Sequence, residues 1–224
     1  MNTETPKVVR LGGALLAVSM LVLMVIVPLY LLIFGAPDGT GRDGSITAKD
    51  YALHLMQSWS FASAKWAIEV CAIALMAVAS FQLSRREVRD GGWLSPSLTW
   101  SCVAVGALCA IPMYFIMLGG YLPAAQGIDT DPTVYPVLRG IATVVFGFGF
   151  AIIHLGLAGS FWVERVGNAI PSWVATLGFI SNLIASLMLF LVFIGLGSLQ
   201  IAGPFGFIGY SFGIVLGVAI WRDR

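Results

Sequence analysis

The sequence has 224 residues, of which 58% are apolar and 10% are charged, whereas an ordinary soluble domain carries roughly 25% charged residues. Such a small number of charged side chains cannot cover the surface of a soluble protein. The composition therefore excludes a soluble protein. The net charge of +1 also excludes the basic surface of a nucleic-acid-binding protein. We therefore expect an integral membrane protein whose main partner is the lipid bilayer, with no nucleic acid bound.

Uncharged stretches bounded by charges predict six membrane-spanning helices in one membrane domain, residues 1–224. The first apolar run follows Lys7 and Arg10 and is far longer than the roughly 7 to 15 residues of a signal-peptide core. Glycines and Pro204 divide the last uncharged stretch into two helices. The predicted fold is all-α, a six-transmembrane helix bundle with spans at residues 11–34, 61–84, 98–122, 140–163, 173–195 and 203–221.

The loop between the first two spans contains a second helical signal. Thr47 and Asp50 have the spacing of a capping box, and Tyr51, Leu55 and Trp59 recur at helical intervals after it. This pattern predicts a short amphipathic helix in the first outer loop, lying on the membrane interface.

The distribution of Lys and Arg predicts the orientation, because these residues are retained on the cytoplasmic side. With both termini inside, eight basic residues lie in inner segments and four in outer ones. The inner set is Lys7, Arg10, Arg85, Arg86, Arg89, Arg165, Arg222 and Arg224, and the outer set is Arg42, Lys49, Lys65 and Arg139. The N and C termini are therefore expected to be cytoplasmic.

Lys65 and Glu69 are the first candidate site, because charges inside a span are often functional. Lys65 lies at the outer interface and Glu69 one turn deeper, and their i, i+4 spacing allows them to pair. One interpretation is a structural ion pair at the mouth of the bundle. The other is that Glu69 binds a cation or a proton in a cavity that opens outward.

His154 is the second candidate, because it is the one ionisable residue near the middle of any predicted span. It lies on a stripe of small residues, and Asn182 lies on a similar stripe of the next helix, at the same depth across a short loop. We predict that His154 and Asn182 face each other. The contact is either an interhelical hydrogen bond or a polar position in a ligand cavity or proton path.

Three further features complete the candidate sites. Tyr114 and Tyr121 could donate hydrogen bonds into an outer cavity, and interfacial anchoring is the alternative explanation of Tyr121. Gly209, Gly213 and Gly217 form two consecutive G-x-x-x-G steps in the sixth span, which permit close approach of a helix of the same chain or of a second copy. No H-E-x-x-H or other metal or cofactor motif occurs in the sequence, so we assign no metal, cofactor or catalytic residue, and catalysis is disfavoured.

Two stretches carry a resemblance to a known family. The opening Val9-Arg10-Leu11-Gly12-Gly13-Ala14-Leu15, and Val163-Glu164-Arg165 through Ile170-Pro171-Ser172-Trp173 into Leu177-Gly178, are similar to a group of small bacterial six-helix membrane proteins catalogued only as a domain of unknown function. The resemblance implies a bacterial cytoplasmic membrane and the same topology. It implies no catalytic residues.

The leading functional hypothesis is binding or permeation of a small neutral or hydrophobic solute. The cavity would open outward near Glu69, Tyr114 and Tyr121, with His154 and Asn182 at its floor. The alternative is a structural or accessory subunit, joined to a second copy or a larger complex through the glycine face of the sixth helix. A membrane enzyme acting on lipid is third. A polar cavity reaching mid-membrane favours the first hypothesis, and a solid core with an exposed glycine face favours the second.

Overall fold

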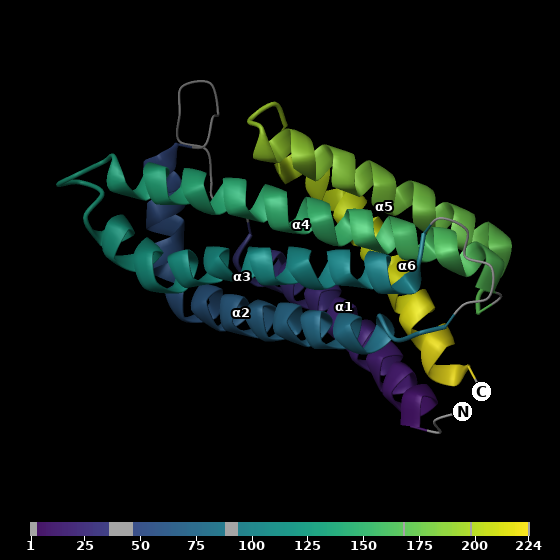
Figure 1. Cartoon of the computed structure of the whole chain (residues 1–224). Coiled ribbons are helices and arrows are strands. Elements are labelled where there is room, and N and C mark those ends of the chain that lie inside the picture. The colour runs from purple at the N-terminus through teal and green to yellow at the C-terminus, as the bar shows by residue number, and fades with distance from the viewer. Residues whose placement is uncertain (1–3, 36–46, 88–93, 168, 198, 224) are drawn as a thin grey trace.

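A computed structural model describes residues 4–35, 47–87, 94–167, 169–197 and 199–223, and this part of the chain forms six α-helices. They are α1 (Glu4–Phe34), α2 (Ala48–Leu83), α3 (Pro96–Gln126), α4 (Val134–Gly167), α5 (Ser172–Phe193) and α6 (Leu199–Arg222) (Figure 1). All six are long and apolar enough to cross a membrane. The prediction of an all-α bundle with six spans is confirmed, and the chain is a multi-pass membrane protein.

The six helices form a ring. Each helix packs against its neighbours in sequence, and α1 packs against α6, while contacts across the ring are few. The lipid-facing side of the ring carries exposed large apolar residues along every helix. This arrangement surrounds a central space to which all six helices contribute side chains.

The amphipathic segment of the first outer loop is part of α2 and not a separate helix. The capping box is present: the Thr47 hydroxyl accepts from the Asp50 backbone N–H, and Asp50 accepts from the Thr47 backbone N–H at 2.7 Å. No Gly or Pro follows before Leu83, so nothing stops the helix between this segment and the second span. In Figure 1 the first part of α2 lies across the end of the bundle before the helix turns along it.

Helices α3 and α4 approach so closely that glycine is required at their contact. A Cβ on Gly106 would lie 2.6 Å from the backbone N of Ile153, and one on Gly149 would lie 2.8 Å from that of Ala110. Small residues at such positions allow helix backbones to approach in a membrane. Substitution there must move one backbone relative to the other.

We expect Gly106→Ala to lower the free energy of unfolding by about 1–3 kcal/mol, since the added methyl overpacks the α3–α4 contact. Gly119→Ala is the matched control on the same helix, because a Cβ there meets nothing within 4 Å. The control should be neutral or should gain up to about 1 kcal/mol from helix propensity. Unfolding in mixed micelles measures both. Equal effects would show that the two helices are not in close contact at Gly106.

The glycine face of α6 is occupied within the chain. A Cβ on Gly217 would lie 2.7 Å from the carbonyl oxygen of Gly13 on α1, and one on Gly213 would overlap the Met20 side chain. A Cβ on Gly209 would lie 2.7 Å from Asn182 Oδ1. These three glycines therefore serve packing of α6 against α1, α4 and α5, and an interface with another chain would need a different face of α6.

Candidate functional site

A cavity of about 480 Å³ lies inside the helix ring. All six tyrosines of the chain line it, together with Lys65, Trp66, Glu69, Arg139, Thr143 and His154. The remaining wall is apolar, with residues of every helix: Leu23, Val27, Leu55, Met113, Met117, Ala142, Phe146, Phe150, Leu189, Leu199, Ala202, Gly203, Gly206 and Phe207. The cavity is thus the place where the chain concentrates its aromatic hydroxyls.

The depth of the cavity follows from the residues of α4. Tyr135 and His154 are the first and last α4 residues that line it, and at 1.5 Å per residue their Cα atoms are about 28 Å apart along the helix. Beyond His154, Leu157, Phe161 and Glu164 are buried but do not line the cavity. The cavity therefore extends from the Arg139 end of the bundle to a floor at His154.

Aromatic side chains and one cation surround the Arg139 end, which we call the mouth. The Arg139 guanidinium lies 3.4 Å from the ring centroid of Tyr51, which belongs to the first part of α2. Tyr121 makes edge contacts with Trp66 and Tyr135, with ring centroids 5.6 and 5.5 Å away. The predicted site residue Tyr121 thus lies in an aromatic cluster that joins α2, α3 and α4 at the mouth.

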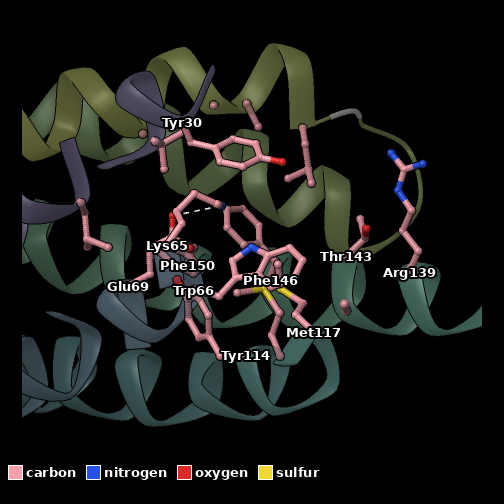
Figure 2. A pocket seen from close by; sticks show the side chains of 18 of the residues that line it. Tyr30, Lys65, Trp66, Glu69, Tyr114, Met117, Arg139, Thr143, Phe146 and Phe150 are labelled. Atoms are coloured by element: carbon pink, nitrogen blue, oxygen red, sulfur yellow. Dashed lines mark hydrogen bonds and ion pairs between the residues drawn. The ribbon is translucent and has the colours of Figure 1, made fainter. Parts of the chain in front are cut away.

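Lys65 and Glu69 form the predicted ion pair, and the pair lies in the cavity wall. Lys65 Nζ is 3.3 Å from Glu69 Oε1, and the two side chains are 14% and 7% exposed. The ammonium also lies 5.3 Å from the ring centroid of Tyr30 and 5.4 Å from that of Trp66 (Figure 2), within range of cation–π attraction. Tyr114, a further predicted site residue, lines the same wall.

His154 forms the floor, and its contact with Asn182 is the one predicted. His154 Nδ1 lies 2.8 Å from Asn182 Oδ1, and both residues are fully buried. His154 lines the cavity but Asn182 does not. Asn182 therefore lies behind the histidine, where its amide N–H groups donate to the carbonyls of Gly178 and Gly209 at 2.8 and 3.4 Å. The expectation that Asn182 itself lies at the cavity floor is corrected: it holds the imidazole from behind.

We expect Asn182→Ala to lower the free energy of unfolding by about 2 kcal/mol, because the buried His154 Nδ1–H would lose its acceptor. Ser181→Ala is the control next in sequence: its half-buried hydroxyl donates only within α5, to the Gly178 carbonyl, and its removal should be near neutral. Both are measured by unfolding in mixed micelles. A change of less than about 0.5 kcal/mol for Asn182→Ala would contradict the buried hydrogen bond.

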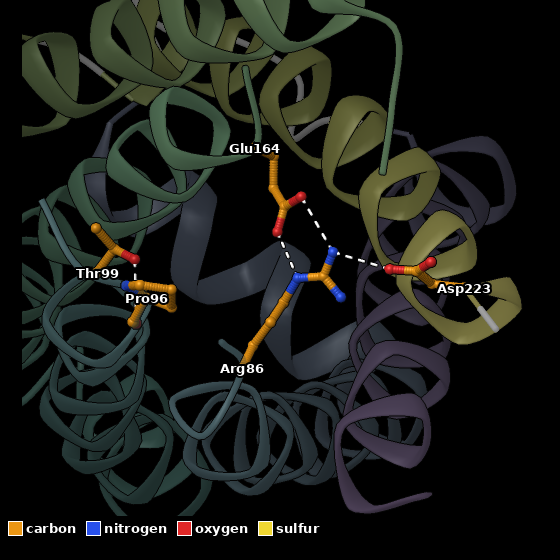
Figure 3. Close-up of polar contacts among 5 residues, drawn as sticks. All are labelled: Arg86, Pro96, Thr99, Glu164 and Asp223. Atoms are coloured by element: carbon orange, nitrogen blue, oxygen red, sulfur yellow. Dashed lines mark hydrogen bonds and ion pairs between the residues drawn. The ribbon is translucent and has the colours of Figure 1, made fainter. Parts of the chain in front are cut away.

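An ion-pair network lies at the opposite end of the bundle, and the sequence did not predict it. Arg86 donates to both Glu164 carboxylate oxygens, at 2.6 and 3.2 Å, and to Asp223 at 3.1 Å (Figure 3). The Arg86 and Glu164 side chains are 10% and 2% exposed. Burial lowers the pKa of Arg86, but its hydrogen bonds to Glu164 and Asp223 outweigh burial and raise it. The network joins the end of α2 to α4 and to the residue after α6.

Sequence reasoning missed several other cavity residues. Tyr30, Tyr51, Tyr135, Arg139 and Tyr210 lie on four different helices, and no local spacing connects them. Most of them stand near predicted span ends, where interfacial anchoring explains a tyrosine or arginine equally well. Only the three-dimensional ring shows that they face one space.

No protein-family model matches the chain, and the searches of curated proteins and of solved structures gave no match either. The resemblance to the small bacterial six-helix family stays a prediction.

Proposed function

We propose that this membrane protein binds a small, neutral and mainly apolar molecule in the tyrosine-lined cavity. Part of the support is the shape of the site. A space of about 480 Å³ with aromatic walls and a few convergent polar groups is typical of small-molecule sites, which measure roughly 300–1,000 Å³.

The observation that carries the proposal is a set of buried polar atoms without partners. In the described residues five such side-chain atoms have no hydrogen-bond partner, and three of them belong to cavity-lining residues: Trp66 Nε1, His154 Nε2 and Tyr210 Oη. A buried polar atom left unpaired costs about 1–3 kcal/mol. A ligand in the cavity would supply the partners and recover that free energy.

The charges of the wall favour a neutral ligand. Glu69 and Lys65 neutralise each other at 3.3 Å, so the middle of the cavity has no net charge to attract an ion. Arg139, at the mouth, already stacks on Tyr51. An ionic ligand would lose hydration without a free counter-charge deeper in the cavity.

The alternative of a structural subunit has less support. Its main argument was a glycine face available to another chain, and that face packs within the chain. Association through another surface of α6, with a second copy or a complex, stays a prediction. Permeation would require the Arg86–Glu164 end to open, so the closed floor favours binding over passage.

For location, we propose a bacterial cytoplasmic membrane with both termini inside. The excess of Lys and Arg at the Arg86 end supports this orientation, which would place the mouth on the outer side. Arg42, Arg89 and Arg224, which contribute to the charge difference, lie outside the described residues.

The proposal is tested by calorimetric titration of 2-methoxynaphthalene into the protein in phosphatidylcholine nanodiscs. Ala142 is buried in the cavity wall, and Ala142→Trp should fill the space with an indole ring. Ala64→Trp is the control, because Ala64 is exposed on α2 and does not line the cavity. Partition into lipid is the same in all three samples. Saturable binding by the wild type and by Ala64→Trp, and its loss in folded Ala142→Trp, is the expected result; identical heats in all three would refute a cavity site.

A further inference from the structure

The floor of the cavity is built by two polar aromatic side chains from different helices. His154 of α4 and Tyr210 of α6 are stacked, with ring centroids 4.8 Å apart and an interplanar angle of 28°. They are 0% and 6% exposed. Neither His154 Nε2 nor Tyr210 Oη has a hydrogen-bond partner among the described residues. Two stacked side chains at the floor therefore each carry a polar atom without a partner.

The contacts of Asn182 determine what His154 offers to that occupant. The Asn182 amide nitrogen donates to the carbonyl oxygen of Gly178 at 2.8 Å, so its Oδ1 is the atom that faces His154 Nδ1 at 2.8 Å. Oδ1 can only accept, so Nδ1 carries the proton. A buried imidazole with no carboxylate bonded to it among the described residues is neutral, and Nε2 therefore presents a lone pair. His154 needs a ligand group that donates.

Helix α6 leaves room beside Nε2 for a ligand atom. Gly206 faces this nitrogen, since a Cβ there would lie 3.5 Å from it, an ordinary contact distance. Tyr210 Oη can donate or accept. One hydroxyl can donate to Nε2 and accept from Tyr210 at the same time, whereas an ether or ketone oxygen would leave Nε2 unpaired.

We infer that the ligand is a neutral alcohol or phenol with an apolar body, which binds with its hydroxyl at the floor between His154 Nε2 and Tyr210 Oη. The inference rests on the proposed function and names the chemical class of its ligand. Its apolar body lies along the aromatic wall between the floor and the mouth.

A pair of matched probes tests it. 2-Naphthol and 2-methoxynaphthalene share the same rings and are neutral at pH 7, but only the first donates a hydrogen bond. In nanodiscs the wild type should bind 2-naphthol about tenfold more tightly, because only its hydroxyl can donate to the otherwise unpaired His154 Nε2, whereas the oxygen of either probe can accept from Tyr210. Equal affinities in the wild type would overturn the inference, and would also be the result if water alone occupied the floor.

Variants test how His154 and Tyr210 each contribute to the binding of the two probes. His154→Phe should remove the preference, and Tyr210→Phe, which deletes only the hydroxyl and is the milder change, should weaken the binding of both probes several-fold, because the oxygen of either probe can accept from Tyr210. His54→Phe is the control: His54 Nε2 is also buried and without a partner in the described residues, but His54 does not line the cavity. A preference that survives His154→Phe would exclude this floor as the hydroxyl site.

Nitrogen NMR gives a second readout. The chain has two histidines, so one variant is enough to assign their signals. In protein labelled with ¹⁵N-histidine, and assigned with His54→Phe, His154 should show a protonated Nδ1 and an unprotonated Nε2. 2-Naphthol should move the Nε2 signal upfield, and 2-methoxynaphthalene should not. A protonated Nε2 would overturn the inference. Failure of the proposed function would look different from failure of this inference. In that case neither probe would bind to the wild type more tightly than to the Ala142→Trp variant.

Discussion

Glu164→Gln is expected to lower the free energy of unfolding by about 3–5 kcal/mol, the largest loss of any single substitution considered. Glu164 accepts two hydrogen bonds from Arg86 in a site where its own side chain is 2% exposed. The amide keeps the size of the side chain but removes the charge. The guanidinium would then stay buried with Asp223 as its remaining carboxylate partner in the described part, through one bond at 3.1 Å.

Two comparisons separate this charge effect from a general loss of packing. Asp223→Asn removes the more exposed partner of Arg86, whose side chain is 48% exposed, and should cost less than about 1 kcal/mol. The double variant Arg86→Met with Glu164→Met should recover most of the stability, since apolar side chains of similar size can replace a buried pair. Unfolding in mixed micelles measures all three. A double variant as unstable as Glu164→Gln would contradict the explanation.

Lys65→Met is expected to cost about 3 kcal/mol, because it leaves the Glu69 carboxylate, in a residue only 5% exposed, without its cation. The ammonium also lies over the rings of Tyr30 and Trp66, and these attractions are lost together with the ion pair. The loss should be smaller than for Glu164→Gln, since Glu69 faces a cavity that water can enter.

The control for Lys65→Met is the same change at a solvent-exposed ion pair, Lys49 and Asp129. Lys49 bonds Asp129 at 2.6 Å, but the two side chains are 57% and 76% exposed, so Lys49→Met should leave unfolding unchanged. Adding Glu69→Gln to Lys65→Met should restore stability, because no unpaired charge remains. If Lys65→Met and Lys49→Met behave alike, Lys65 and Glu69 are not paired in a buried wall.

The fold was largely predictable because a bilayer imposes strong rules on composition. Apolar runs of about 20 residues are long enough to cross a bilayer, and each predicted span lies mostly within one observed helix. The prediction that was wrong is the separate amphipathic helix at residues 47–60. The amphipathic pattern there was recognised, but a sequence pattern does not show whether a helix stops before the next one begins, and α2 continues through it.

The candidate site was predictable only in two cases: where the contact is local in sequence, and where two residues of neighbouring helices are equally far from the loop that joins them. The Lys65–Glu69 pair follows from i, i+4 spacing, and His154 and Asn182 follow from equal distances to one loop. Tyr210 and the Arg86–Glu164 pair could not be found this way, because each depends on which distant helices become neighbours in the ring. Arg86 was interpreted as a topology signal, and nothing in its spacing indicates that it is buried.

We propose, as the central point, that the cavity opens on the outer side and ends before the Arg86 end of the bundle. Cysteine accessibility tests it most directly, in a background with Cys71, Cys102 and Cys109 replaced by alanine. Thr143 lines the cavity, whereas Ser160 lies 17 residues further along α4, buried beyond the floor and bonded to the Gly156 carbonyl. A membrane-impermeant thiol reagent should label Thr143→Cys in right-side-out vesicles, should not label it in inverted vesicles, and should not label Ser160→Cys in either. Labelling of Thr143→Cys only in inverted vesicles, or in neither, would contradict the account.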